Sequence, residues 1–137
     1  NLALTEANLE VAMKLAREQV NEKGLKIAMT PNLLIVPPAL EFTAEKIVKS
    51  VQLPGGNNND INPMRGRFEV FVYDYLTDSD AWFLVDKSMN PLEFFWREKL
   101  NFKATNDFDT DVAKYKGRCR FSSGWTDWRG ILGANAT

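Results

Sequence analysis

The stretch from Val112 to Phe121 reads V-A-K-Y-K-G-R-C-R-F and continues through S-S-G-W-T-D-W-R-G to Gly130. Basic and apolar side chains alternate here, as in a strand whose two faces meet different surroundings. One face carries Lys114, Lys116, Arg118 and Arg120. The other carries Ala113, Tyr115, Cys119 and Phe121. The alternation predicts a basic face that reaches solvent or a neighbour and an apolar face that is buried in the fold.

Two tryptophans follow this strand and flank an acidic and a basic residue. Trp125 and Trp128 lie on either side of Asp127, and Arg129 comes next. A carboxylate and a guanidinium two residues apart can pair at short range. We therefore predict a local Asp127–Arg129 pair and not a ligand site.

Upstream, the apolar spacing predicts two helices separated by a buried strand. The first helix runs from about Glu6 to Lys23, with Thr5 as its N-cap and Gly24 as its stop. A short apolar run at Leu33–Val36 ends at two prolines, which indicates a strand that leads into the second helix. The apolar face of that helix is expected to contain Leu40, Ala44, Ile47, Val48 and Val51.

The remaining segments read as a polar loop and several strands. The loop, from Leu53 to Pro63, is rich in Gly and Asn and is expected to be exposed. Strands are predicted at Phe68–Tyr73, Ala81–Val85, Leu92–Trp96, Leu100–Ala104 and Ala113–Phe121, in one mixed or antiparallel sheet. Because helices and strands are segregated along the chain, the fold class is α+β and not doubly wound α/β.

The amino-acid composition argues against several classes of protein. The 137 residues are 45% hydrophobic, which is enough for one compact domain, and the net charge of -1 argues against a dedicated nucleic-acid binder. The absence of His removes Ser–His and Cys–His nucleophile pairs and histidine metal ligands. Residues Asp107 to Asp111 have the opening spacing of a calcium loop, but Val112 and Arg118 stand where that loop needs Gly and Glu. We expect no catalytic residue, no cofactor, no metal and no membrane association.

Several segments occur in an order that resembles a known family. They are Leu4–Leu9, Thr30–Glu41, Asn62–Gly66, Phe68–Tyr73, Trp82–Asp86 and the stretch that ends at Gly133. Together they resemble the C-terminal part of tailed-phage major capsid proteins, in particular the Mu-like major head subunits and the prohead protease/major capsid fusions.

The resemblance implies a Hong Kong 97-like capsid fold. Residues 1–106 would then form an axial-type domain with a sheet and flanking helices, and residues 107–137 a C-terminal strand and tail that return to the peripheral domain. Members of the family also have an N-terminal arm, an extended hairpin loop and a spine helix, which we expect to be absent from this chain. We therefore interpret the chain as a piece of a longer protein.

The function that the resemblance implies is structural. Copies of the subunit would form pentamers and hexamers of an icosahedral shell in the virion, assembled in the bacterial cytoplasm, around double-stranded DNA contacted only weakly and non-specifically. Scaffold, maturation protease and portal are the other implied partners. The alternatives are a fragment of a phage maturation protease and a monomeric binding module that does not assemble.

Two groups of residues are candidate subunit contacts. The loop supplies Gly55, Gly56, Asn57, Asn58, Asn59 and Asp60. The basic face of the last strand supplies Lys114, Lys116, Arg118 and Arg120. For this basic face three interpretations stay open: charges that protect an edge strand from unwanted pairing, a contact with a neighbouring subunit, and a contact with packaged DNA.

Overall fold

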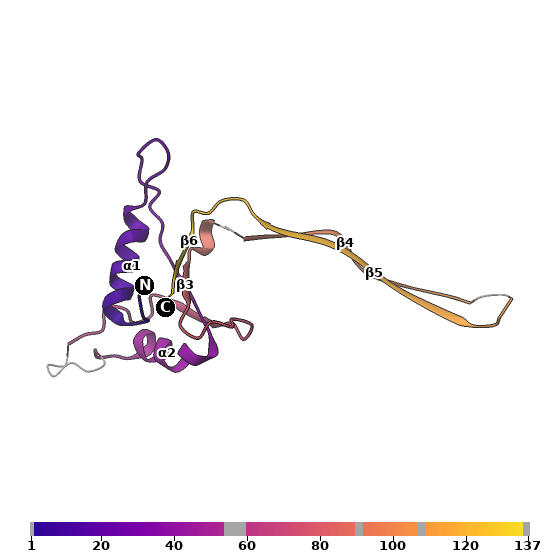
Figure 1. The fold of residues 1–137 in the computed structure, drawn as a ribbon, viewed down its shortest axis with the longest axis horizontal. Helices are drawn as coiled ribbons and strands as arrows, with labels where there is room; N and C mark the ends of the chain where they lie inside the picture. The colour runs from indigo at the N-terminus through magenta and orange to yellow at the C-terminus, as the bar shows by residue number, and fades with distance from the viewer. Residues whose placement is uncertain (1, 54–59, 90–91, 107–108, 136–137) are drawn as a thin grey trace. The chain divides into compact units, whose positions relative to one another are not determined.

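A computed structural model describes residues 2–53, 60–89, 92–106 and 109–135. The chain divides into two units, Asn1–Pro91 with Asp127–Thr137, and Leu92–Thr126. The first unit contains helices and a sheet, and the second is a hairpin of two strands (Figure 1). The mixed α+β composition is confirmed. Within the described ranges, no helix combines the length and the apolar character needed to cross a bilayer.

Helix α1 (Glu6–Glu18) begins as the sequence predicts. The Thr5 hydroxyl accepts a hydrogen bond of 3.3 Å from the Asn8 N–H, which is the N-cap contact. Leu9, Ala12 and Ala16 form the buried stripe of the helix.

The end of α1 differs from the prediction, because the helix stops at Glu18 and not at Lys23. The side chain of Asn21 accepts hydrogen bonds of 2.9 Å from the N–H groups of Lys23 and Leu25. Gly24 has a φ of 77°, and Val20 pairs with Lys26. Asn21 thus organises a tight turn whose local hydrogen bonds replace those of another helical turn.

The first unit contains a four-stranded sheet in the order β2-β1-β3-β6. Its strands are β1 (Leu33–Val36), β2 (Glu69–Val72), β3 (Trp82–Val85) and β6 (Ile131–Ala134). Strands β1 and β2 are parallel, and the other two pairings are antiparallel. The predicted strands near residues 33–36, 68–73 and 81–85 are confirmed, whereas β6 was not predicted. Single 3-10 turns, η1 (Pro38–Leu40) and η2 (Lys87–Met89), follow β1 and β3.

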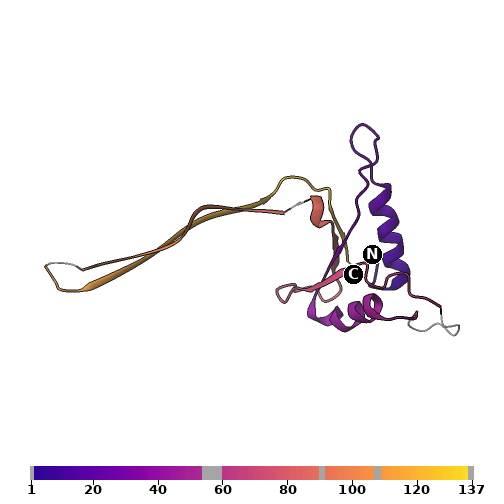
Figure 2. The ribbon, with the colours of Figure 1, turned by 180° about the vertical axis from the view of Figure 1, so that it is seen from behind.

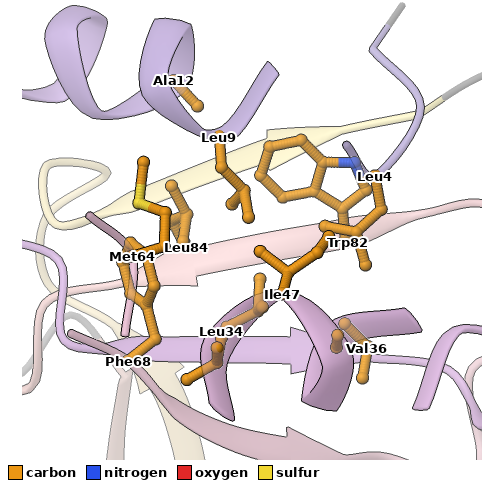
Figure 3. Close-up of a cluster of buried hydrophobic side chains, with 12 residues drawn as sticks. Leu4, Leu9, Ala12, Leu34, Val36, Ile47, Met64, Phe68, Trp82 and Leu84 are labelled. Atoms are coloured by element: carbon orange, nitrogen blue, oxygen red, sulfur yellow. The ribbon is translucent and has the colours of Figure 1, made fainter. Parts of the chain in front are cut away.

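Both helices pack on one face of this sheet, where Figure 3 shows the core. Side chains on that face are Leu34, Val36, Trp82 and Leu84. They meet Leu9 and Ala12 of α1 and the buried side chains of α2 (Glu41–Lys49), which are Ala44, Ile47 and Val48. Val51 does not belong to this face as predicted, because it lies beyond the end of α2 and is exposed.

The second unit is formed by β4 (Leu92–Asn106) and β5 (Ala113–Trp125), which pair antiparallel from Leu92↔Trp125 to Asn106↔Ala113. Figure 2 shows the pair as a long twisted ribbon; at about 3.3 Å per residue, β5 is roughly 43 Å long. These strands were predicted to complete the main sheet, but among the described residues they pair only with each other. The expected domain boundary at residue 106 therefore falls inside a long hairpin that the sequence did not reveal.

Candidate subunit interface

The basic face of β5 lies where the alternation predicts, on the surface. Lys114, Lys116, Arg118 and Arg120 are all exposed. In the register of the hairpin Lys103 lies opposite Lys116, so like charges face each other directly across the ribbon. Such a pair destabilises an isolated hairpin and favours a partner that brings negative charge.

One acidic residue of β4 neutralises part of this positive charge. Glu98 Oε2 lies 3.1 Å from Arg118 Nε. Glu98, Asn101, Lys103, Lys116 and Arg118 line a small cavity of about 80 Å³. Strands β4 and β5 together carry seven Lys or Arg against two Glu, so the ribbon stays basic.

The opposite face of the ribbon is aromatic and exposed. The rings of Phe94, Trp96 and Phe121 contact one another, with centroid distances of 5.1, 5.2 and 5.9 Å. Leu92 and Trp125 share this face, as the register shows. All five side chains are more than half exposed.

The predicted burial of this apolar face is therefore wrong. Tyr115 and Phe121 are 81% and 59% exposed, and Cys119 is exposed as well. The alternation assigned these side chains correctly to one face, but burial needs a third layer, and no described element supplies one. An exposed aromatic surface of this kind marks an interaction site.

Two irregularities of β4 change which of its residues share a face with the basic side chains of β5, although Phe95 also lies on that face, opposite Ser122. The register shifts between Trp96 and Glu98 and again between Glu98 and Asn101. The first shift places Glu98 opposite Arg120 on the basic face, and the second returns Phe102 to the aromatic face opposite Gly117. A Cβ at position 117 would lie 3.1 Å from the Phe102 ring, so glycine gives that ring its space. No local sequence signal marks these bulges.

The second group of candidates lies largely outside the described residues. Gly55, Gly56, Asn57, Asn58 and Asn59 fall there, so their role as contacts stays a prediction. Asp60 is described and exposed, and its carbonyl accepts a hydrogen bond of 3.0 Å from the Leu53 N–H. Gln52 pairs with Ile61 next to it. The two ends of the loop are thus held side by side.

Asn62 fixes the base of this loop, a role that the sequence pattern did not predict. Its side chain is buried, and its Nδ2 donates to the Ile47 carbonyl at 2.6 Å and to the Ser50 hydroxyl at 3.0 Å. Its Oδ1 accepts from the Met64 N–H at 2.8 Å. Asn62 therefore ties the loop to the C-terminal end of α2. An Asn before a Pro is the only sequence signal for this role.

The predicted pairing of Asp127 with Arg129 is confirmed. Arg129 Nη1 lies 2.9 Å from Asp127 Oδ2, and the Arg129 N–H also donates to that carboxylate. These hydrogen bonds lower the pKa of Asp127. Arg129 also lies 3.4 Å from Glu22 and 5.2 Å from the centre of the Trp128 ring. The pair thus joins the segment before β6 to the turn after α1.

A phage capsid protein family model matches residues 1–134. The chain is also 33% identical over 73 residues to the major capsid protein of Escherichia phage Mu. This match covers 53% of the chain and 24% of the Mu protein, so it spans only part of that relative's length. No solved structure matches the chain. Since the family model covers nearly every residue, the chain belongs to the phage capsid protein family.

Proposed function

We propose that this chain is part of a major head subunit of a tailed phage or prophage. Copies of the whole protein would assemble into an icosahedral shell that encloses double-stranded DNA. The match of the capsid family model over residues 1–134 supports this proposal, as does the similarity to the Mu major capsid protein. The role we propose is structural and not catalytic.

The observation that carries the proposal is the two-faced hairpin. Its aromatic face, centred on Phe94, Trp96 and Phe121, is exposed, and its other face is basic. A two-stranded ribbon is marginal in water unless something packs on its apolar face. In a shell, contacts of this kind are repeated by symmetry, so many modest contacts add up to a stable particle.

For the fold we propose the Hong Kong 97-like arrangement. The unit with the four-stranded sheet would be the axial-type domain, and β5 would belong to the peripheral domain. Strand β4 would go with β5, because the two pair over their whole length. Residues 131–134 would stay with the axial-type unit, because β6 pairs with β3.

We further propose the partners that such a subunit needs. The main partners would be other copies of the same protein in pentamers and hexamers. The remaining protein partners would be scaffold, maturation protease and portal. The basic face of β5 would contact a neighbouring subunit, with weak and non-specific DNA contact as the other role for it. The protein would act in the virion capsid after assembly in the host cytoplasm.

Electron microscopy of the expressed full-length protein tests the proposal. We expect closed shells or capsid-like rings, and a smaller yield of them when Phe121→Ser places a hydroxyl in the aromatic face. The matched control is Phe42→Ser, which changes an exposed ring on α2. A full-length protein that remains monomeric at high concentration would contradict a capsid role.

A further inference from the structure

The four-stranded sheet has a second face on which no described helix lies. Its helix-covered face carries Leu34, Val36, Trp82 and Leu84, all of which belong to the core with α1 and α2 (Figure 3). Side chains alternate along each strand, so the residues that neighbour the core-facing ones in the strands point to the opposite side of the sheet. These include Leu33, Ile35, Phe71 and Phe83, which we call the open face.

Apolar residues of the open face lie in one row across the sheet. Phe71 of β2 is opposite Ile35 of β1, and Ile35 is opposite Phe83 of β3. Phe83 in turn is opposite Gly133 of β6. The Phe83 ring occupies the space beside that glycine, since a Cβ there would come within 2.9 Å of it. The row is therefore a continuous apolar strip, in which Ile35 and Phe83 are half-buried and Phe71 is exposed.

An aromatic ladder extends the strip beyond the end of the outer strand, β2. The rings of Phe71 and Tyr73 stack with centroids 6.4 Å apart, and those of Tyr73 and Tyr75 are 5.7 Å apart. Phe71 is 51% exposed, and both tyrosines are exposed. Large rings in this number on the surface of one sheet favour docking of another layer.

The segment that holds β2 and β3 is rich in acidic residues, one of which, Glu69, is paired with Lys87. From Phe68 to Asp86 the chain has no Lys or Arg, and it has five acidic residues, Glu69, Asp74, Asp78, Asp80 and Asp86. Asp86 is buried, and the others lie at or near the surface. The hairpin strands carry the opposite charge, with seven basic residues against two acidic ones. The hairpin and the segment that holds β2 and β3 thus differ in net charge, although the basic side chains of β5 lie on the ribbon face opposite to the aromatic one.

We propose that the aromatic face of the β4–β5 hairpin of one copy packs on the open face of the sheet of a second copy. This inference rests on the proposed function and specifies which surfaces of neighbouring subunits meet. Because the two surfaces differ, the contact is head-to-tail. In a closed ring of copies, every aromatic face and every open face would then have a partner. Half-exposed aromatic side chains in this number bury on the order of 1,000 Å² in total, which is at the lower limit for a specific interface.

Photo-crosslinking in assembled full-length protein tests this proposal. Phe121→p-benzoylphenylalanine places a reactive ketone in the aromatic face, and irradiation joins it to whatever C–H group lies against it. An equal mixture of ¹⁵N-labelled and unlabelled protein distinguishes crosslinks between copies from crosslinks within one. We expect crosslinked peptides from β1, β2 or β3, with labelled and unlabelled chains joined in the proportion that random mixing gives.

Two further variants provide controls. Phe42→p-benzoylphenylalanine reacts from α2, on the helix-covered side, and should give no crosslink to the open face. Phe71→Lys introduces a charge into the apolar strip and should lower the yield of the Phe121 crosslink about tenfold, as expected for loss of one central contact. Phe42→Lys should leave that yield unchanged.

Other outcomes would overturn the inference. Crosslinks confined to single copies would mean that the hairpin covers its own sheet. Crosslinks to other segments of the full-length protein would mean that those segments cover the aromatic face. In either case shells could still form, and the proposed function would stand. Absence of both particles and crosslinks would count against both proposals.

Discussion

The carboxylate of Asp86 accepts a hydrogen bond of 2.8 Å from the backbone N–H of Thr30, fifty-six positions earlier in the chain. Asp86 is only 2% exposed, and its other oxygen accepts from the N–H and the hydroxyl of Ser88. The Thr30 hydroxyl donates at 3.3 Å to Asp86 Oδ2, the same oxygen that accepts from the Thr30 N–H. One buried side chain therefore joins the segment before β1 to the turn after β3.

This network predicts that Asp86→Asn destabilises the first unit. The amide cannot accept all four hydrogen bonds, and at least one buried donor loses its partner. We expect the free energy of unfolding to fall by about 2 kcal/mol, as for other hydrogen bonds to a buried charged group. Urea denaturation followed by tryptophan fluorescence measures the change. Asp74→Asn, at an exposed carboxylate, is the matched control and should shift the midpoint little.

The same network predicts the response to acid. Burial of Asp86 raises the pKa of its carboxyl, but the hydrogen bonds from Ser88 and Thr30 outweigh burial and leave the pKa below its ordinary value. Because the pKa of Asp86 is lower in the folded state than in the unfolded state, its charge stabilises the fold fully above the unfolded pKa of about 3.9. That contribution is lost as the pH falls through the folded pKa. The stability difference between wild type and Asp86→Asn should thus be constant near neutral pH and shrink below about pH 4. A difference that persists unchanged in acid would show that Asp86 contributes nothing by its charge.

Asn62 gives a second prediction for stability. Asn62→Ala removes the hydrogen bonds to Ile47, Ser50 and Met64 and leaves buried groups without partners. We expect a loss of about 2 kcal/mol in the free energy of unfolding. Asn106→Ala, on the exposed hairpin, is the control for losing an Asn side chain. Equal stability of the two variants would mean that Asn62 does not fix the base of the loop.

Within this chain alone, substitutions on either face of the hairpin should cost little. Phe121→Ala removes two ring contacts of a side chain that is already half exposed, so we expect a cost of about 1 kcal/mol and not the cost of a core truncation. Arg118→Ala breaks one exposed ion pair, worth under about 1 kcal/mol. Thermal unfolding monitored by circular dichroism measures both. A loss of about 3 kcal/mol for Phe121→Ala would mean that the aromatic face is covered within a single copy.

The sequence predicted those features that depend on neighbours along the chain. The Thr5 cap, the strand at Leu33–Val36 and the pairing of Asp127 with Arg129 each follow from residues a few positions apart. The two faces of β5 were also assigned correctly, because alternation alone fixes which side chains share a face.

The features that it missed depend on contacts distant in the chain. Alternation cannot say whether a third layer covers Phe121, and so the burial of the aromatic face was predicted wrongly. Sequence spacing likewise did not show that β4 would pair with β5 alone, or that bulges near Glu98 would place Glu98 on the basic face and return Phe102 to the aromatic face. The early end of α1 arises from the side chain of Asn21, whose turn competes with a helix that apolar spacing would allow to continue.

The most direct test of the account is the fraction of full-length protein that sediments as assembled particles, compared between Phe121→Ser and Phe42→Ser. We expect Phe121→Ser to lower that fraction strongly while both variants stay folded, because only Phe121 belongs to the aromatic face of the hairpin. Phe42→Ser should assemble like the unchanged protein. Equal assembly of the two variants would contradict the claim that the hairpin holds neighbouring subunits together.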